Sequence, residues 1–436
     1  MQTMRLARAL TACALAAALS SCKSLEVPNT NDPDAERALS DPSAVEAVAA
    51  GAMRTWFNAY EGLLAAGTLS VMARTYSSSW NNANMNFYSG VDNPTSPSAQ
   101  WNRNSRAWQN EPAAAARTSV EWLWSGGANQ AGVTYPGFYS ALSSATDVLF
   151  AIRARGVVIR DEADTRRAEA IAALMQGAAL MGLALNYDKA FIVNEDIDFT
   201  NPDWPKLLAY STRKELRDAA VAKLTDAMTV ANAGTFSTPS GWTGGGASYS
   251  NTQIARIAAT MAALTLAYYP RTAAENAQVD WARVAQLASA GMGASSGAAF
   301  DLVFIGDGCS AWCPEILVWF NSMDTGRLNT RVARLLDPAT QTDPWPFPNG
   351  NPQPNSPDRR LGDGSFGNAS MITGFGNVPK TANAGTDFAW SAQGAVFRPD
   401  RGSYHQSNLA HIRYDESGTQ SSAGIYFGFG PSPVIS

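Results

Sequence analysis

Apolar residues recur at helical spacing from Ala163 to Phe191, the longest such pattern in the chain. Side chains three and four positions apart form one apolar face, which predicts an α-helix: Ile171, Leu174, Met175, Ala178, Met181 and Leu185. Asp161 or Asp164 can cap its start. Glycine inside a helix costs about 1 kcal/mol relative to alanine, so Gly177 and Gly182 indicate that other helices approach closely. The pattern therefore predicts a buried helix with neighbours on several sides.

The same spacing predicts helices before and after this stretch. They cover residues 42–60, 63–73, 113–124, 135–154, 212–231, 250–269 and 280–292. Beyond about residue 295, short apolar runs alternate with Pro, Gly and polar residues, which predicts a few short strands. The candidate strands are residues 299–305, 395–398, 409–414 and 424–429, with 315–320 as a strand or a short helix. The predicted fold is mainly α-helical, with long irregular loop insertions.

Two of the predicted helices contain a similar sequence near their ends. The residues LALNY at 183–187 are echoed by LTLAY at 264–268, 81 positions later. Each follows an Ala-rich helix and precedes, after a loop, another helix. This arrangement favours repeated helix pairs, in which no unit can bury its apolar face alone. Chance similarity between two helices rich in Ala and Leu is the alternative.

Residues 1–22 have the pattern of a targeting segment. Arg5 and Arg8 form a basic start, and the apolar run at 9–18 is too short to span a bilayer. The small residues that follow lead directly into Cys22, which resembles the lipobox of bacterial lipoproteins. We therefore expect cleavage before Cys22 and lipidation of its thiol, which would anchor the protein to a membrane. An ordinary signal peptide that happens to contain a cysteine is the alternative.

The remaining chain divides into a tether at 23–41 and a single domain at 42–436, with a loop-rich insertion from about residue 295 onward. The chain has 32 basic and 37 acidic residues, and loss of the targeting segment takes the formal charge from −5 to −7. No Lys/Arg cluster is present, so the sequence does not favour a nucleic-acid partner. No later apolar run predicts a membrane-spanning helix.

Cysteine use indicates one local cross-link. Cys309 and Cys313 lie in the sequence CSAWC, and in an exported protein a disulfide between them is plausible, with two free thiols as the alternative. A loop this small gives little entropic stabilisation, so the bond would chiefly hold Trp312 in place. The only two histidines, His405 and His411, are far away in sequence, and no metal site is predicted.

Candidate ligand-binding residues gather around a long irregular segment at 77–98. It is rich in Ser, Asn, Gly and Pro, and its aromatic residues argue against disorder. Sugars stack on aromatic rings and form hydrogen bonds with amides and guanidinium groups. The predicted ligand-binding set is Arg74, Tyr76, Trp80, Asn81, Asn82, Trp101 and Trp108, with Trp312 and Trp319 as weaker candidates. Most of the 13 tryptophans will be core residues, and Trp56, Trp122 and Trp281 fit helix packing.

Catalysis has weaker support in the sequence. Glu195, Asp196 and Asp198 could supply the carboxylate pair of a glycoside hydrolase. Acidic residues on a connector are more typical of a solvated surface or a cation site. The Gly-rich stretch at 241–248 lacks the lysine and the preceding strand of a phosphate-binding loop. We therefore predict a protein that is not an enzyme and has no cofactor.

Taken together, several stretches resemble the SusD/RagB family of outer-membrane nutrient-binding lipoproteins. They are Cys22 with the tether LEVPNTNDPD, the helix start DPSAVEAVAAGAMRTW, LALNYDKAFI at 183–192, YYPRTAAENAQVDWARV at 268–284, and RGSYHQSNLAHIRY at 401–414. No single one of these is as specific as a zinc or P-loop signature, but they span most of the chain in the order that the family shows.

The resemblance implies tetratricopeptide-like helix pairs decorated by long loops. It also implies a lipid-anchored protein on the extracellular face of the outer membrane, which captures an oligosaccharide or other nutrient for a SusC-like TonB-dependent transporter. Family members usually continue from a stretch like SAGIYFGFGPSPVIS into further helices, so we expect the last helical pair to be missing. A surface-anchored glycan-degrading enzyme and a purely structural or adhesive lipoprotein are the alternatives.

Overall fold

The computed structural model describes residues 39–61, 70, 73–78, 134–197, 208–307, 310–313, 326–343, 388–390, 407, 409–411 and 426–429. Of the interpretable part of the chain, 61% is helical and 8% is in strands. The prediction of a mainly α-helical fold is therefore confirmed.

The helices lie close to their predicted positions. The longer ones are α3 (Pro42–Tyr60), α6 (Thr134–Leu149), α7 (Glu162–Asn186), α9 (Arg213–Asn232), α10 (Asn251–Tyr268) and α12 (Trp281–Ser289). The short ones are α11 (Ala273–Asn276) and α14 (Thr330–Leu336), with the π-helical turn η4 (Phe150–Ala154) after α6 and the 3-10 turns η5 (Ser240–Thr243) and η6 (Ala294–Ser296). The predicted helix at 113–124 and most of the one at 63–73 lie outside the described residues.

Side-chain caps explain where the long helices begin. Of the two candidate caps of α7, Asp161 is the one used, because its carboxylate accepts a hydrogen bond from the backbone N–H of Asp164 at 2.8 Å. Helices α9 and α10 each begin with a capping box, led by Thr212 and Ser250. Such caps satisfy backbone donors that the first helical turn leaves free.

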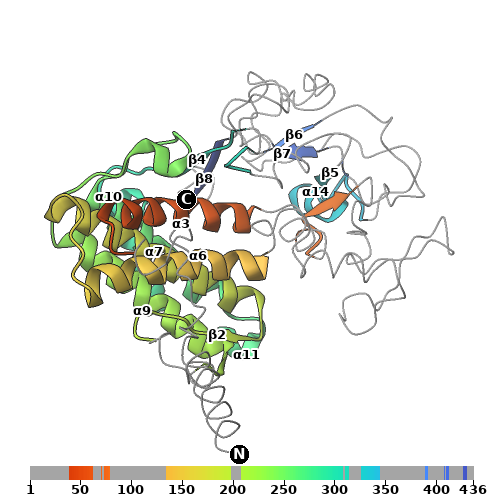
Figure 1. The fold of residues 1–436 in the computed structure, drawn as a ribbon. Coiled ribbons are helices and arrows are strands. Elements are labelled where there is room, and N and C mark those ends of the chain that lie inside the picture. Colours follow the sequence, from red (N-terminus) through yellow and green to blue (C-terminus); the bar gives the residue numbers. More distant parts are fainter. Residues whose placement is uncertain are drawn as a thin grey trace, which may run out of the picture.

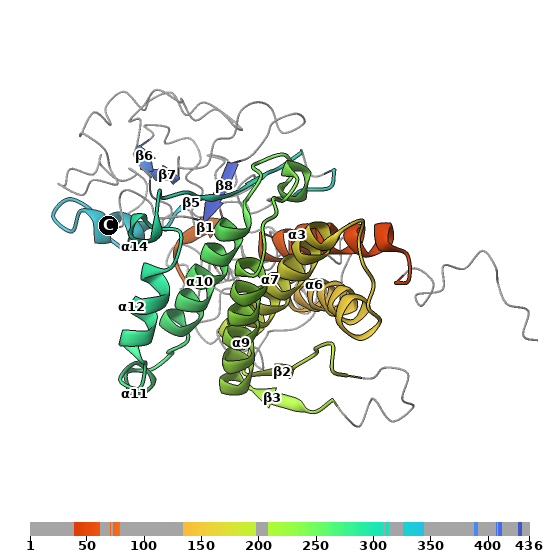
Figure 2. The same ribbon diagram turned by 90° about the vertical axis from the view of Figure 1, so that its left-hand side faces the viewer.

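Helix α7 is the centre of the helical domain. It packs against α3, α6, α9 and α10, so it has neighbours on several sides, as its sequence predicts. Figures 1 and 2 show α7 between α6 and α9, with α10 beyond. The main apolar core is built from these helices together with strand β4 (Leu302–Ile305).

By length and composition, α7 could cross a membrane, contrary to our expectation that no later segment has this property. In the structure, however, 83% of its most apolar stretch is buried inside the protein. The central helix of a compact domain passes the same test, because its apolar side chains face neighbours all round. This burial shows that α7 is a core helix of the domain.

The small residues of α7 lie where neighbouring helices come closest. A Cβ atom at Gly182 would lie 2.5 Å from the ring of Phe138 on α6, and one at Gly177 would lie 2.6 Å from Leu224 on α9. Both distances are shorter than a carbon–carbon contact allows. The two glycines therefore permit close approach on two different sides of the helix, as the sequence predicts.

The aromatic tail of the predicted helix is not helical. Helix α7 ends at Asn186, and Lys189–Phe191 form strand β2, which pairs antiparallel with β3 (Tyr210–Thr212). The side chains explain the change: Phe191 stacks on Tyr210 across the strands at 4.2 Å, and the Tyr139 hydroxyl bonds both backbone groups of Phe191. Cross-strand aromatic pairing of this kind favours strands over a continued helix.

The other short strands lie mainly around a second, smaller apolar cluster. Strand β1 (Tyr76–Ser78) pairs with β5 (Gly326–Leu328), and β6 (Phe388–Trp390) pairs with β7 (Leu409–His411). Figure 1 shows β1, β5, β6, β7 and α14 together, away from the helical domain. The cluster contains Leu328, Ala333, Leu336 and Leu409, with Tyr76 and Val332 packed against it.

The remaining pair joins β4 to β8 (Tyr426–Phe429). The strands predicted at 299–305, 409–414 and 424–429 are thus present in shortened form, whereas those at 395–398 and 315–320 lie outside the described residues. The Gly-rich stretch before α10 packs against β4. A Cβ atom at Gly244 would lie 2.2 Å from the Ile305 carbonyl oxygen, and one at Gly246 would lie 2.4 Å from that of Val303. These glycines permit close backbone packing.

Of the two described tryptophans that the sequence assigns to helix packing, one is predicted correctly. Trp56 on α3 is buried, as expected, whereas Trp281, at the start of α12, is 48% exposed. Trp122 lies outside the described residues. The prediction for Trp281 is wrong because only one side of α12 packs, through Leu287, on α10.

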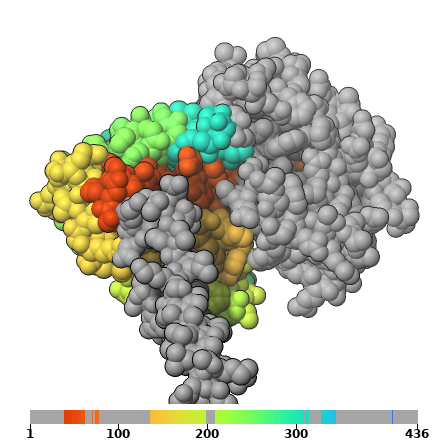
Figure 3. Space-filling model, viewed as in Figure 1, coloured from red at the N-terminus to blue at the C-terminus, as the bar shows by residue number. Residues whose placement is uncertain are grey.

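In Figure 3 the outer side of α3 (red) is visible between the yellow surface that follows α6 and the green surface before α10.

Candidate functional site

The described start of the predicted ligand-binding segment is the stretch from Arg74 to Ser78. Tyr76 lies in β1, opposite Leu328 of β5, and Arg74 lies two residues before the first residue of this strand. Arg74 has a φ angle of +56°, in the left-handed region that non-glycine residues seldom adopt. Such backbone conformations persist only where the surroundings fix them. The contacts of Arg74 show what fixes this one.

The guanidinium group of Arg74 is bound by the segment that contains α14. It forms an ion pair with Asp343, and Asn329 lies at 3.5 Å from the same nitrogen. Asp343 also accepts a hydrogen bond from the Thr330 hydroxyl at 2.8 Å. The side chains of Arg74 and Asp343 are only 22% and 13% exposed. Arg74 is therefore held by the protein itself and acts as an anchor for the start of the segment.

Backbone contacts reinforce this anchor. The Asn329 N–H donates to the Thr75 carbonyl at 2.9 Å, and the Arg331 side chain donates to the Ala73 carbonyl at 2.6 Å. The Ser407 N–H bonds the carbonyl of Leu328 at 2.9 Å. Three segments that are distant in sequence thus meet at the start of the predicted ligand-binding segment.

Removal of the Asp343 carboxylate is expected to loosen this anchor. Asp343→Ala leaves a partly buried guanidinium group without its ionic partner, which costs about 1–3 kcal/mol locally. We expect faster hydrogen exchange in β1 and β5 and unchanged exchange in α7, measured by mass spectrometry. Arg334→Ala, at an exposed position on the neighbouring helix α14, is the control and should change neither region. Equal exchange in Asp343→Ala and the wild-type protein would contradict the anchoring role.

Trp312, a weaker candidate in the sequence, packs into the core. It is 8% exposed and lies against the rings of Phe57 and Phe304, with centroids 5.7 Å and 5.8 Å away. The Asn58 side chain holds the adjoining backbone, donating to the Ala311 carbonyl at 2.9 Å and accepting from the Cys313 N–H at 3.0 Å. Its ring faces are therefore occupied by protein, and its placement favours packing over ligand binding.

The structure also places part of the predicted cross-link. Cys313 is disulfide-bonded, whereas Cys309, its predicted partner, lies outside the described residues. The other predicted residues outside the described ranges are Trp80, Asn81, Asn82, Trp101, Trp108, Trp319 and the lipidation residue Cys22. Of the described members of the predicted ligand-binding set, Tyr76 packs against the smaller apolar cluster, whereas Trp312 belongs to the main core.

Glu195, the first acid of the connector, is held in an ion network. It pairs with Lys223 at 2.7 Å and with Arg153 of η4 at 2.7 Å, and the buried Gln176 amide donates to it at 3.2 Å. Burial is the largest single effect and acts to raise the pKa of Glu195, but the hydrogen bonds from Lys223 and Gln176 and the charge of Lys223 together outweigh it and hold the pKa below its usual range. A glycosidase acid needs a raised pKa, so Glu195 fits the role of a structural carboxylate.

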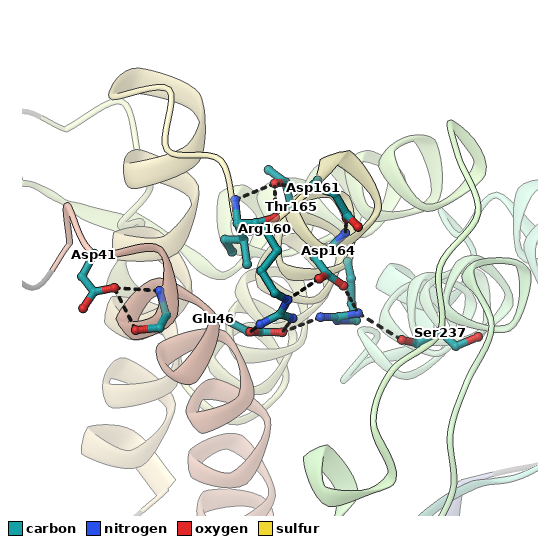
Figure 4. A network of polar contacts seen from close by, with 10 residues as sticks. Asp41, Glu46, Arg160, Asp161, Asp164, Thr165 and Ser237 are labelled. Carbon is teal, nitrogen blue, oxygen red and sulfur yellow. Dashed lines mark hydrogen bonds and ion pairs between the residues drawn. The ribbon is translucent and has the colours of Figure 1, made fainter.

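A second ion network joins α3 to α7 (Figure 4). Glu46 of α3 bonds Arg160 at 2.6 Å and Arg167 of α7, and Asp164 bonds both arginines. Hydrogen bonds from Arg160 and Arg167 hold the pKa of Glu46 below its usual range against the effect of burial. The two carboxylates and two guanidinium groups balance in charge. The network therefore fits a structural connection between helices.

Glu61, which the sequence does not single out, is a buried carboxyl group. It follows the last residue of α3, is 2% exposed, and its Oε2 atom has no hydrogen-bond partner among the residues that the structure describes. Burial alone raises the pKa of Glu61 to about 8. No sequence signal distinguishes it, because a glutamate after a helix is usually solvated. Among the described residues no group of three or more His, Cys, Asp or Glu side chains is placed to hold a metal ion.

Comparison with known proteins adds no further constraint. The chain matches no family model, no curated protein and no solved structure.

Proposed function

We propose that this protein is a SusD/RagB-like lipoprotein that binds a nutrient and does not catalyse a reaction. The packing order of the helices carries the proposal. Each long helix packs on the next in the chain, from α3 through α6, α7, α9 and α10 to α12, and α7 also contacts α3 and α10. Stacked helix pairs of the tetratricopeptide type have this order, because each pair buries its face against its neighbours.

The sequence echo supports the same proposal. LALNY closes α7 and LTLAY closes α10, and each of these helices packs on the helix before it and on the helix after it in the chain. Leu183 is buried, and Tyr187 and Tyr268 lie at the C-terminal ends of their helices. An echo at the ends of two helices with matching neighbours supports the proposal of repeats.

In this proposal the helices form a scaffold and the ligand-binding residues lie on the segment from 74 to 108. An oligosaccharide would stack on Trp80, Trp101 or Trp108 and form hydrogen bonds with Asn81 and Asn82, while Arg74 holds the start of the segment. Lipid on Cys22 would anchor the protein to the extracellular face of the outer membrane. A SusC-like TonB-dependent transporter would receive the bound nutrient.

Trp80→Ala is expected to weaken oligosaccharide binding by up to about tenfold, since loss of one aromatic stacking surface removes about 0.5–1.5 kcal/mol. Binding is measured by calorimetry on the full-length protein in a detergent without a sugar headgroup, against a panel of neutral oligosaccharides. The melting temperature should stay unchanged, which separates binding from folding. The Trp56→Ala variant is the matched contrast: Trp56 is buried, so its loss should lower the melting temperature.

Two results would contradict the proposal. One is the absence of any binder across the panel, which would favour a structural or adhesive lipoprotein. The other is release of shorter sugars from a bound oligosaccharide, which would show that the protein is a glycan-degrading enzyme.

A further inference from the structure

Two aromatic side chains are unusually exposed at one end of the helical domain. Tyr268, the last residue of α10, is 68% exposed, and Trp281, the first residue of α12, is 48% exposed. Helices α10 and α12 pack side by side, and Figure 2 shows α11 at the end where α10 finishes and α12 begins. Neither ring stacks on another aromatic ring or a cation within the part of the chain that the structure describes. Both rings are therefore open to a ligand.

The backbone beneath the two rings is held firmly. The ring of Tyr269, next to Tyr268, contacts the guanidinium groups of Arg213 and Arg217, whose Cζ atoms lie 4.1 Å and 4.5 Å from its centroid. The Tyr269 carbonyl accepts a hydrogen bond from Arg213 at 2.6 Å. Asp280 caps α12 directly before Trp281. Because the positions are fixed before any ligand arrives, binding would cost little ordering of the chain.

The charged groups at this end carry both signs and are held by the protein: Asp280 accepts a hydrogen bond from the Arg283 N–H, and the Arg283 side chain donates to Gln286. Arg271 pairs with Asp188, and Arg213 pairs with Glu275. The exposed polar side chains between the two aromatic residues include the neutral amides of Asn276 and Gln278. Neither amide makes a hydrogen bond within the described ranges. A charged polymer would find no surplus of either sign of charge here, whereas a neutral polyhydroxyl chain would find apolar ring faces together with amide donors and acceptors.

We propose that Tyr268 and Trp281, with Asn276 and Gln278 between them, form a second carbohydrate-binding surface for neutral glycan chains. This surface lies at the α10–α11–α12 end of the domain and shares no residue with the segment at 74–108. This inference rests on the proposed function, because it assumes the same class of ligand, an oligosaccharide. Its role would be to hold a longer glycan while the segment at 74–108 binds another part or another chain.

The test uses the full-length Trp80→Ala protein in a detergent without a sugar headgroup. Calorimetry with cellohexaose, maltohexaose, xylohexaose and mannohexaose at about 1 mM measures the second surface without the first. We expect at least one of them to bind, and we expect Tyr268→Ala/Trp281→Ala in the same background to weaken that binding about tenfold or more. A charged hexagalacturonate should bind no better than the neutral chains.

The control is Val158→Ala/Leu335→Ala, which removes two exposed apolar side chains elsewhere, 61% and 70% exposed. It should leave both binding and the melting temperature unchanged. Unaltered binding in the Tyr268/Trp281 double variant would overturn the second surface. Complete loss of binding in Trp80→Ala alone would also overturn it, while leaving the proposed function in place. If wild-type protein binds none of the four hexasaccharides, both proposals fail for neutral hexose and pentose chains.

Discussion

Glu61→Gln is expected to raise the melting temperature at pH 8 and to change it little near pH 5. In the folded protein burial raises the pKa of Glu61 from 4.5 to about 8. Below pH 4.5 the carboxyl is protonated in both folded and unfolded chains, so the folded state carries no penalty. As the pH rises from 4.5 to about 8, the unfolded chain releases this proton while the folded protein retains it. The free energy of unfolding therefore falls across this window.

The size of the effect follows from the same pKa difference. Each pKa unit corresponds to about 1.4 kcal/mol, so the full shift can lower the free energy of unfolding by roughly 5 kcal/mol at most. Local relaxation of the protein and entry of water around the ionised carboxylate reduce this loss, and we expect a loss of a few kcal/mol. Glutamine has nearly the same shape and stays neutral, so Glu61→Gln removes the penalty at alkaline pH.

Circular dichroism melts of the full-length protein from pH 5 to pH 9 measure this directly. The difference in melting temperature between Glu61→Gln and wild type reports on Glu61 alone, because all other titratable groups are the same in both proteins. Val158→Ala is the control, because the Val158 side chain is 61% exposed and carries no titratable group, and its difference from wild type in melting temperature should show no trend with pH. A difference for Glu61→Gln that is flat from pH 5 to pH 9 would mean that Glu61 is not a buried carboxyl group.

Gly182→Leu is expected to lower the stability of the whole helical domain. Its Cβ atom alone would lie 2.5 Å from Phe138, whose ring is buried and cannot move aside freely. Overpacking of this kind costs about 1–3 kcal/mol. Because α7 contacts α3, α6, α9 and α10, the strain should reach every neighbour, and we expect a lower denaturant midpoint and a lower melting temperature.

Gly182→Ala and Gly51→Ala provide a matched pair. Both glycines lie inside helices, but a Cβ atom at Gly51 has nothing within 4 Å. Alanine at an unobstructed helical position stabilises by about 0.5–1 kcal/mol relative to glycine. Gly51→Ala should therefore raise the denaturant midpoint, whereas Gly182→Ala should lower it. If Gly182→Ala also raised the midpoint, the close contact between α6 and α7 would be wrong.

The helices were predictable because their signals are local. Apolar spacing and the caps at Asp161, Thr212 and Ser250 place α7, α9 and α10 to within a few residues. The glycines of α7 also carried packing information, because a helix tolerates them chiefly where a neighbour is close. The predicted helical tail at Lys189–Phe191 failed because cross-strand contacts with Tyr210, distant in sequence, decide the backbone there.

The candidate site was less predictable for the same reason. Composition identifies the segment at 74–108, but it does not show that Arg74 is held by Asp343, which lies 269 positions away. Residue type also does not distinguish exposed from buried tryptophans: Trp281 is exposed and Trp312 is buried, contrary to expectation for both. The burial of Glu61 depends wholly on its surroundings and leaves no trace in the sequence.

The central claim is that the helices form a scaffold and that the ligand binds to the segment from 74 to 108. Hydrogen exchange of the full-length protein, with and without the neutral oligosaccharide that binds most tightly in calorimetry, tests it most directly. We predict that the ligand slows exchange within residues 74–108 and leaves exchange in α7 unchanged. Slower exchange in α7 without any change at 74–108 would contradict the account, because the ligand would then bind the scaffold itself.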